Sequence, residues 1–123
     1  LLDNGRNLIV LDAYNANPSS MSAALRNLAA MESGRERIAI LGDMLELGKD
    51  ASLEHARIVE LAAQLRMPCL FAGPLFSSCA PPDRSYANTE QLRRHLESQP
   101  VTGKLILVKG SRGIGLERII DAL

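Results

Sequence analysis

Short apolar runs that alternate with segments of helical periodicity restrict the fold of this sequence more than any other feature. The runs cover residues 7–12, 37–42, 69–73 and 104–110, with a shorter candidate strand at 84–87. Nearly continuous apolar runs of this length are typical of parallel strands that are covered on both faces. The sequence therefore predicts a parallel sheet buried between two layers of helices.

Helical segments fill the stretches between the runs. Asn17 stands before Pro18, which suits the first helical position, and Asn88 lies three residues before Gln91, in a pattern that resembles a capping box. The predicted helices cover residues 18–31, 51–66, 88–98 and 115–123, and residues 43–50 and 74–83 are predicted to be irregular. This alternation predicts a three-layer, doubly wound α/β fold with a mostly parallel, Rossmann-like sheet and helices on both faces.

The first residues predict one antiparallel strand. Asn4-Gly5 is typical of a two-residue hairpin, so residues 1–2 are expected to pair antiparallel with the run at 7–12. The chain has 123 residues, which is enough for one domain with a substantial core, and it does not begin with Met. We therefore expect residues 1–123 to form a single domain that is part of a longer protein.

Charge and cysteine content argue against several classes of function. Lys plus Arg and Asp plus Glu each number 14, and this zero balance argues against a nucleic-acid surface or an anionic membrane surface. No apolar run approaches the ~20 residues of a membrane span. Cys69 and Cys79 lack the spacing of zinc ligands, and two isolated cysteines indicate a reducing compartment. We expect no nucleic acid, no membrane and no metal site in this chain.

Three glycines near the end of the sequence invite comparison with a dinucleotide-binding turn. Gly110, Gly113 and Gly115 follow an apolar run, but their spacing is G-x-x-G-x-G and no second strand can follow them before the chain ends. The sequence therefore disfavours a nicotinamide site. A receiver-like signalling domain would explain Asp12 and Lys109 at strand ends, but the run at 69–73 offers no phospho-acceptor Asp.

Polar and glycine-rich residues follow most of the predicted parallel strands. Asp12, Asp43, Gly73 and Lys109 each stand at or just after the end of a run. In open α/β sheets, ligands bind at the carboxyl ends of the strands. The sequence thus predicts a ligand site at this edge.

Three stretches at these strand ends resemble a known family when they are taken together. They are DAYNANPSSM at 12–21, AILGDMLELG at 39–48 and LVKGSRG at 107–113, and in this order they resemble the carboxyl-terminal domain of Mur ligases. The resemblance covers nearly the whole chain and is strongest to the members that use D-alanyl-D-alanine. It implies a Rossmann-like domain that closes over a central ATPase domain and brings the incoming amine.

The resemblance also implies the reaction and the partners. A bacterial, cytoplasmic ligase of this kind uses ATP and Mg to convert the carboxylate of UDP-N-acetylmuramoyl-tripeptide into an acyl phosphate, which D-alanyl-D-alanine then attacks in peptidoglycan precursor synthesis. Its amino-terminal and central domains would be partners of this chain, and the central domain would hold most of the ATP and Mg. No G-x-x-x-x-G-K-[ST] phosphate loop occurs here, so we expect the 123 residues alone to be inactive.

The first strand-end segment is the candidate nucleotide site under this resemblance. The matching segment of related ligases touches the ribose and base of ATP, which makes Asp12, Tyr14, Asn15 and Asn17 the candidate nucleotide-binding residues. A carboxylate accepts hydrogen bonds from ribose hydroxyls, and an Asn amide both donates and accepts. Asn17 is expected to cap the following helix in addition.

The other two segments are the candidate site for D-alanyl-D-alanine. Asp43 and Glu46 are expected to hold the ammonium of the dipeptide and to offer a route for its proton. Arg112 offers a planar fork for the dipeptide carboxylate, with Ser111 and Lys109 beside it. No residue of the chain is assigned a catalytic role.

Two points stay open at the level of sequence. The helix that is expected to begin near Gly115 would add free N–H groups to an anion site. His55 is either a structural residue or a functional one, and it is not assigned as catalytic. A freestanding doubly wound binding module or receiver-like signalling module is the alternative reading of the same fold.

Overall fold

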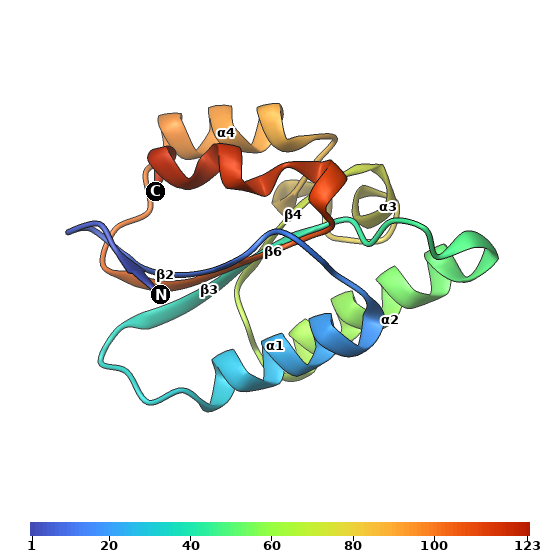
Figure 1. Cartoon of the computed structure of the whole chain (residues 1–123), viewed down its shortest axis with the longest axis horizontal. Helices are drawn as coiled ribbons and strands as arrows, with labels where there is room; N and C mark the ends of the chain where they lie inside the picture. Colours follow the sequence, from blue (N-terminus) through green and yellow to red (C-terminus); the bar gives the residue numbers. More distant parts are fainter.

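A six-stranded sheet runs through the middle of the molecule and separates two layers of helices (Figure 1). The computed structural model describes all residues from 1 to 123. The spatial order is β1-β2-β6-β3-β4-β5, and only β1 is antiparallel to its neighbour. The strands are β1 (Leu2–Asp3), β2 (Leu8–Asp12), β3 (Glu36–Gly42), β4 (Cys69–Ala72), β5 (Ser85–Tyr86) and β6 (Lys104–Lys109). The mostly parallel sheet and the amino-terminal hairpin are confirmed.

The helices lie on both faces of the sheet, as Figure 1 shows. One face is covered by α1 (Pro18–Ala30) and α2 (Ala51–Gln64), and the other by α4 (Thr89–Ser98) and a 3-10 helix at Leu116–Ala122. The chain moves along the sheet from β2 through β3 and β4 to β5, and then returns to place β6 between β2 and β3. Right-handed connections that reverse direction put their helices on opposite faces, which explains the two layers.

Each helical layer packs through its own apolar cluster. Met21 and Leu25 of α1 are fully buried and belong to the cluster that lies beneath α1 and α2. Leu92 of α4 packs in the second cluster with Leu116 and Ile119 of the 3-10 helix. The buried residues of α1 and α4 recur at helical spacing, as the sequence predicts.

The helix expected over residues 115–123 is present at Leu116–Ala122, where it is wound as a 3-10 helix. Residues Arg112–Ile114 and Leu116–Ala122 form two 3-10 helices, and Gly115 between them has a φ of +70°. A 3-10 helix stacks residues that are three apart on one side, which directs both Leu116 and Ile119 to the core. Local periodicity does not separate this winding from a short α-helix.

The segment at 74–83, which was expected to be irregular, also contains regular structure. Pro74–Ser77 forms a single helical turn, α3, and Pro82–Arg84 forms a 3-10 turn. The sequence gives α3 little intrinsic support, since four residues are too few to form a stable helix alone. Its support comes from a buried carboxylate on another loop, described below.

The connections that leave the sheet change face at β6. The loops after β2 and β3 lead to α1 and α2, whereas the loop after β6 leads to the 3-10 helix on the opposite face (Figure 1). The loop after β6 is therefore flanked by two loops that turn the other way. Such a switch point opens a crevice at the carboxyl ends of the strands, and the candidate residues gather there.

Candidate functional site

The loop after β2 combines internal ties with one open aromatic ring. The half-exposed carboxylate of Asp12 accepts a hydrogen bond from Nζ of Lys109, and the carbonyl oxygen of Asn15 accepts another from the same ammonium at 3.0 Å. Asn17 caps α1, because its Oδ1 accepts from the backbone N–H of Ser20 at 2.9 Å. Tyr14 keeps 69% of its surface exposed. The capping role expected for Asn17 is confirmed.

Lys109 and Ser111 join the loop after β6 to its neighbours. Lys109 is only 2% exposed, and its ammonium is held by Asp12 and Asn15. The hydroxyl of Ser111 accepts from the N–H of Leu45 at 2.9 Å and donates to the carbonyl of Ala16 at 3.5 Å. The Ser111 hydroxyl thus joins three strand-end loops. Lys109 and Ser111 both stabilise the site through hydrogen bonds inside the chain.

A close backbone contact explains why residue 110 at this strand end is a glycine. A Cβ on Gly110 would lie 2.9 Å from the Cα of Gly42, so the backbones after β6 and β3 are in close contact. The glycine serves the packing of two strand ends against each other. This role requires no cofactor.

Arg112 and Tyr14 form the part of the site that faces solvent. Nη1 of Arg112 donates to the Tyr14 hydroxyl at 3.2 Å, and its Cζ lies 4.9 Å from the centre of the tyrosine ring. Such a cation–π contact holds a guanidinium in place while leaving most of its N–H groups free. The pair borders a cavity of about 390 Å³ that is lined by Leu11, Asp12, Ala13, Tyr14, Arg112 and Glu117.

Glu117 is a wall residue of this cavity that the sequence reasoning did not select. It follows the glycine turn on the 3-10 helix and is exposed. The only sequence signal for it is its position shortly after the last strand end. Its carboxylate shares the cavity with Asp12 and with the guanidinium of Arg112.

Asp43 lies in the interior, and this differs from its expected place on an open ammonium site. Its two carboxylate oxygens accept from the backbone N–H groups of Leu75 at 2.8 Å and Phe76 at 2.9 Å, at the start of α3. The residue has no exposed surface. Gly73 makes this approach possible, since a Cβ there would lie 2.3 Å from the Asp43 carboxyl carbon and its φ is +122°. In this conformation the carboxylate stabilises α3 and is closed to an incoming ligand.

Glu46 is the open carboxylate of the loop after β3. It is exposed and adopts a φ of +66°, which is uncommon for a residue with a side chain. Its side chain makes no hydrogen bond within the chain. Glu46 and Arg112 are therefore the two charged residues of the expected dipeptide site that remain accessible.

His55 is buried at the start of α2 and is structural in its contacts. Its Nε2 lies 3.0 Å from the N–H of Met44, its Nδ1 lies 2.7 Å from the carbonyl oxygen of Ala51, and its ring packs edge-on against Phe76 at 4.6 Å. The residue has no exposed surface. Direct contact with a ligand is excluded in this conformation.

The turn that leads into the last helix uses part of its polar backbone within the chain. The Gly115 N–H donates to the carbonyl of Arg112 at 3.1 Å, and the Arg118 side chain folds back on the carbonyls of Gly115 and Ile114. Arg118 therefore occupies the space beside the turn. The Gly115 N–H is therefore not free for an anion, and the anion site near this turn stays a prediction.

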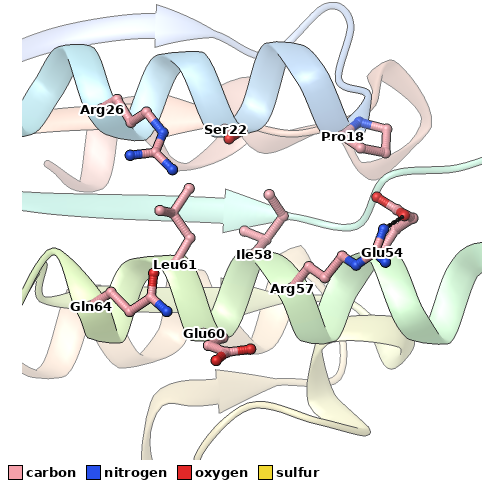
Figure 2. A pocket seen from close by; sticks show the side chains of 9 residues that line it. All are labelled: Pro18, Ser22, Arg26, Glu54, Arg57, Ile58, Glu60, Leu61 and Gln64. Carbon is pink, nitrogen blue, oxygen red and sulfur yellow. Dashed lines mark hydrogen bonds and ion pairs between the residues drawn. The ribbon is translucent and has the colours of Figure 1, made fainter.

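Three other hollows lie away from this edge. Figure 2 shows a groove of about 290 Å³ between α1 and α2, where Arg26 and Gln64 lie on opposite sides and Arg57 pairs with Glu54 at 2.8 Å. Two further cavities lie near the amino ends of the strands. None of them contains a residue of the expected ligand sites. The structure gathers no group of three or more His, Cys, Asp or Glu side chains able to hold a metal, and it has no helix long and apolar enough to span a membrane.

Comparison with known proteins agrees with this architecture. Residues 1–112 match the family described as "Mur ligase, glutamate ligase domain". The UDP-N-acetylmuramoyl-tripeptide–D-alanyl-D-alanine ligase of Treponema pallidum is 39% identical over 120 residues, covering 89% of this chain and 26% of the relative. The same-named enzyme of Mycobacterium tuberculosis is 34% identical over 143 residues, covering 94% of this chain and 28% of the relative. The chain thus spans about a quarter of the length of these relatives.

Solved structures show the same fold. A crystal structure of MurF from Acinetobacter baumannii superposes with a TM-score of 0.80 at 26% identity, over 98% of this chain and 28% of that one. MurF ligase from Thermotoga maritima, solved in complex with ADP, gives a TM-score of 0.79 at 22% identity over 98% of this chain and 29% of that one. The sheet order and the strand-end loops agree with the match over residues 1–112. The chain therefore belongs to the Mur ligase family and corresponds to its glutamate ligase domain.

Proposed function

We propose that this chain is the carboxyl-terminal domain of an ATP-dependent peptide ligase that adds D-alanyl-D-alanine to UDP-N-acetylmuramoyl-tripeptide. The names of the relatives from Treponema pallidum and Mycobacterium tuberculosis support this substrate pair. The remaining domains of the ligase would supply the phosphate loop and the UDP-linked substrate. The reaction would take place in the bacterial cytoplasm, where ATP is available.

The single observation that carries the proposal is the placement of Arg112. Its guanidinium is exposed at the switch point of the sheet, is held over the Tyr14 ring, and faces a cavity of about 390 Å³. A guanidinium in this position suits the carboxylate of a dipeptide, because its planar fork binds both oxygens. Ser111 and Lys109 support Arg112 by fixing the loop that carries it.

Glu46 is proposed to receive the amino end of the dipeptide. The amine arrives as an ammonium and has to lose a proton before it attacks an acyl phosphate, so an accessible carboxylate beside it is useful. Glu46 is accessible, whereas Asp43 is enclosed by α3. We therefore assign Asp43 to the support of the loop rather than to the ammonium.

The nucleotide is proposed to contact the loop after β2. The exposed ring of Tyr14 offers an apolar face to a base, and the half-exposed carboxylate of Asp12 can accept from ribose hydroxyls. Asn15 and Asn17 are on the same loop with exposed side chains. These groups suit the sugar and base of ATP, and they include no cradle for its phosphates. ATP supplies the phosphoryl group, and we assign the phosphates and Mg to the other domains.

Steady-state kinetics of Arg112 variants in the full-length ligase test this proposal. A charge-assisted hydrogen bond contributes about 1.5–3 kcal/mol, so Arg112→Ala is expected to raise the KM for D-alanyl-D-alanine about tenfold or more. The KM for ATP is expected to stay within about twofold, and Arg112→Lys to give a smaller change because Lys offers a point charge.

Arg94→Ala is the matched control, since Arg94 is an exposed arginine on α4. It is expected to leave both KM values unchanged. An Arg112→Ala ligase with an unchanged KM for the dipeptide would remove Arg112 from the substrate site and with it the basis of the proposal.

A further inference from the structure

His55 is the buried titratable residue that the proposed binding surface leaves unexplained. It lies in α2, behind the loop after β3, and no part of it reaches solvent. It nevertheless contacts the loop that carries Glu46, through the backbone of Met44. A buried polar side chain is expected to have its hydrogen bonds satisfied, and these bonds define the state of the ring.

The two ring contacts select one tautomer of His55. The carbonyl oxygen of Ala51 can only accept, so Nδ1 at 2.7 Å from it has to carry the proton. The Met44 N–H can only donate, so Nε2 at 3.0 Å has to present its lone pair. Asp43 Oδ1 lies 3.9 Å from Nε2, but the Asp43 carboxylate is already bonded by Leu75 and Phe76. The contacts describe a neutral imidazole with its proton on Nδ1.

Consecutive residues of the loop are each held by a different element. The Asp43 carboxylate is bound by α3, the Met44 N–H by His55 of α2, and the Leu45 N–H by the Ser111 hydroxyl of the loop after β6. The Ser111 N–H also donates to the Asp43 carbonyl at 3.1 Å. Glu46, the next residue, has an exposed side chain. The position of Glu46 relative to Arg112 thus depends on ties made just before it.

We propose that His55 is a positioning residue that fixes how the loop after β3 aligns with the loop after β6. As a neutral acceptor it fixes Met44, which aligns the Leu45 N–H with Ser111. It thereby fixes the distance between Glu46 and Arg112 that a bound dipeptide has to bridge. This inference rests on the proposed function, because it assigns the dipeptide to those two residues.

Three substitutions separate the two hydrogen bonds of His55. Gln at this position reaches as far as Nε2 and keeps an acceptor for Met44, whereas Asn reaches only as far as Nδ1 and keeps the partner of Ala51. Leu retains apolar volume and loses both. In the full-length ligase we expect His55→Asn and His55→Leu to raise the KM for D-alanyl-D-alanine about tenfold, and His55→Gln to stay within about threefold. The KM for ATP is expected to change little in all of them.

A purely structural role predicts a different pattern. Melting temperatures would fall in all three variants while the KM for the dipeptide stayed the same in His55→Asn and His55→Gln. That result would overturn the inference, even if Arg112→Ala had raised the same KM and upheld the proposed function. An unchanged KM in Arg112→Ala would remove the proposed function and this inference together.

Nitrogen NMR of the wild-type full-length protein, labelled at histidine, provides a readout that does not depend on turnover. The inference predicts a His55 ring with a protonated Nδ1 and an unprotonated Nε2. A proton on Nε2, or a rapid mixture of tautomers, would contradict the tie to Met44 and overturn the inference.

Discussion

At the scale of single residues, the site divides into side chains that build it and side chains that remain open. Lys109, Ser111 and Asp43 are bonded within the chain, while Arg112 and Glu46 are exposed. The sequence identifies this set because charged and small polar residues follow the strands. The sequence does not tell which of these side chains are bonded and which are exposed, because hydrogen-bond partners such as Leu45 and Ser111 are 66 positions apart.

Asp43 is expected to matter more for stability than for direct contact with substrate. Asp43→Asn leaves one acceptor oxygen for the N–H groups of Leu75 and Phe76, and an unsatisfied buried donor costs about 1–3 kcal/mol. Urea unfolding of the variant should show a loss of this size. Glu46→Gln, the control on the same loop, should unfold like the wild type. Equal stability of Asp43→Asn and wild type would contradict the bonding to α3.

Cys69 provides a pH-dependent contribution to stability. Burial raises the pKa of its thiol from 9.0 to about 12. The folded state therefore keeps its proton at pH values where the unfolded chain loses it, and the stabilisation present below about pH 9 declines as pH rises toward 12. The slope is at most about 1.4 kcal/mol per pH unit.

The Cys69 contribution is measured against a variant that lacks the thiol. The difference in unfolding free energy between wild type and Cys69→Ala should shrink between pH 8 and 10. Cys79→Ala is the comparison at the exposed cysteine, where a smaller change with pH is expected because the thiol is less buried. A difference for Cys69→Ala that does not vary with pH would be inconsistent with a strongly raised pKa.

At the scale of elements, local sequence predicts the helices with strong caps and misses structural details that depend on distant contacts. Asn17 and Asn88 cap α1 and α4 as expected. The turn α3 depends on the carboxylate of Asp43, which lies more than 30 positions away from it. The 3-10 helix Leu116–Ala122 packs against α4. The sequence predicts a helix over residues 115–123, but it does not indicate its 3-10 winding or the turn α3.

The cap of α1 has a measurable effect. Asn17→Ala removes the acceptor for the Ser20 N–H, and losing an N-cap side chain costs about 1 kcal/mol. Asn27→Ala is the control within the same helix, where Ala is the better helix former and no loss is expected. Thermal or urea unfolding of the two variants compares them directly. A loss of the same size in Asn27→Ala would show that the effect does not come from the cap.

At the scale of the whole molecule, strand direction follows from the sequence and strand order does not. The alternation of strands and helices predicts parallel pairing with helices on both faces. The position of β6 between β2 and β3 rests on tertiary contacts. Asn7 is one of them, because its buried side chain donates to the carbonyls of Val101 and Leu123 and accepts from the Lys104 N–H at 3.0 Å.

Asn7 is therefore expected to hold the start of β2 beside the start of β6. Asn7→Ala leaves three backbone groups without their partner, and each buried unsatisfied group costs about 1–3 kcal/mol. The unfolding free energy should fall by several kcal/mol, while Asn4→Ala in the exposed turn should cost less. Hydrogen exchange should show faster opening at the Lys104 amide in Asn7→Ala. An unchanged rate at that amide would contradict the role given to Asn7.

We expect the incoming dipeptide to be held at the switch point at β6. The most direct test is a crystal structure of the full-length ligase with D-alanyl-D-alanine and a nucleotide bound. We expect the dipeptide carboxylate at hydrogen-bond distance, about 3 Å, from the Arg112 guanidinium, with its amino group toward Glu46. A dipeptide bound elsewhere, with Arg112 in contact only with Tyr14, would show that the loop after β6 is not the dipeptide site.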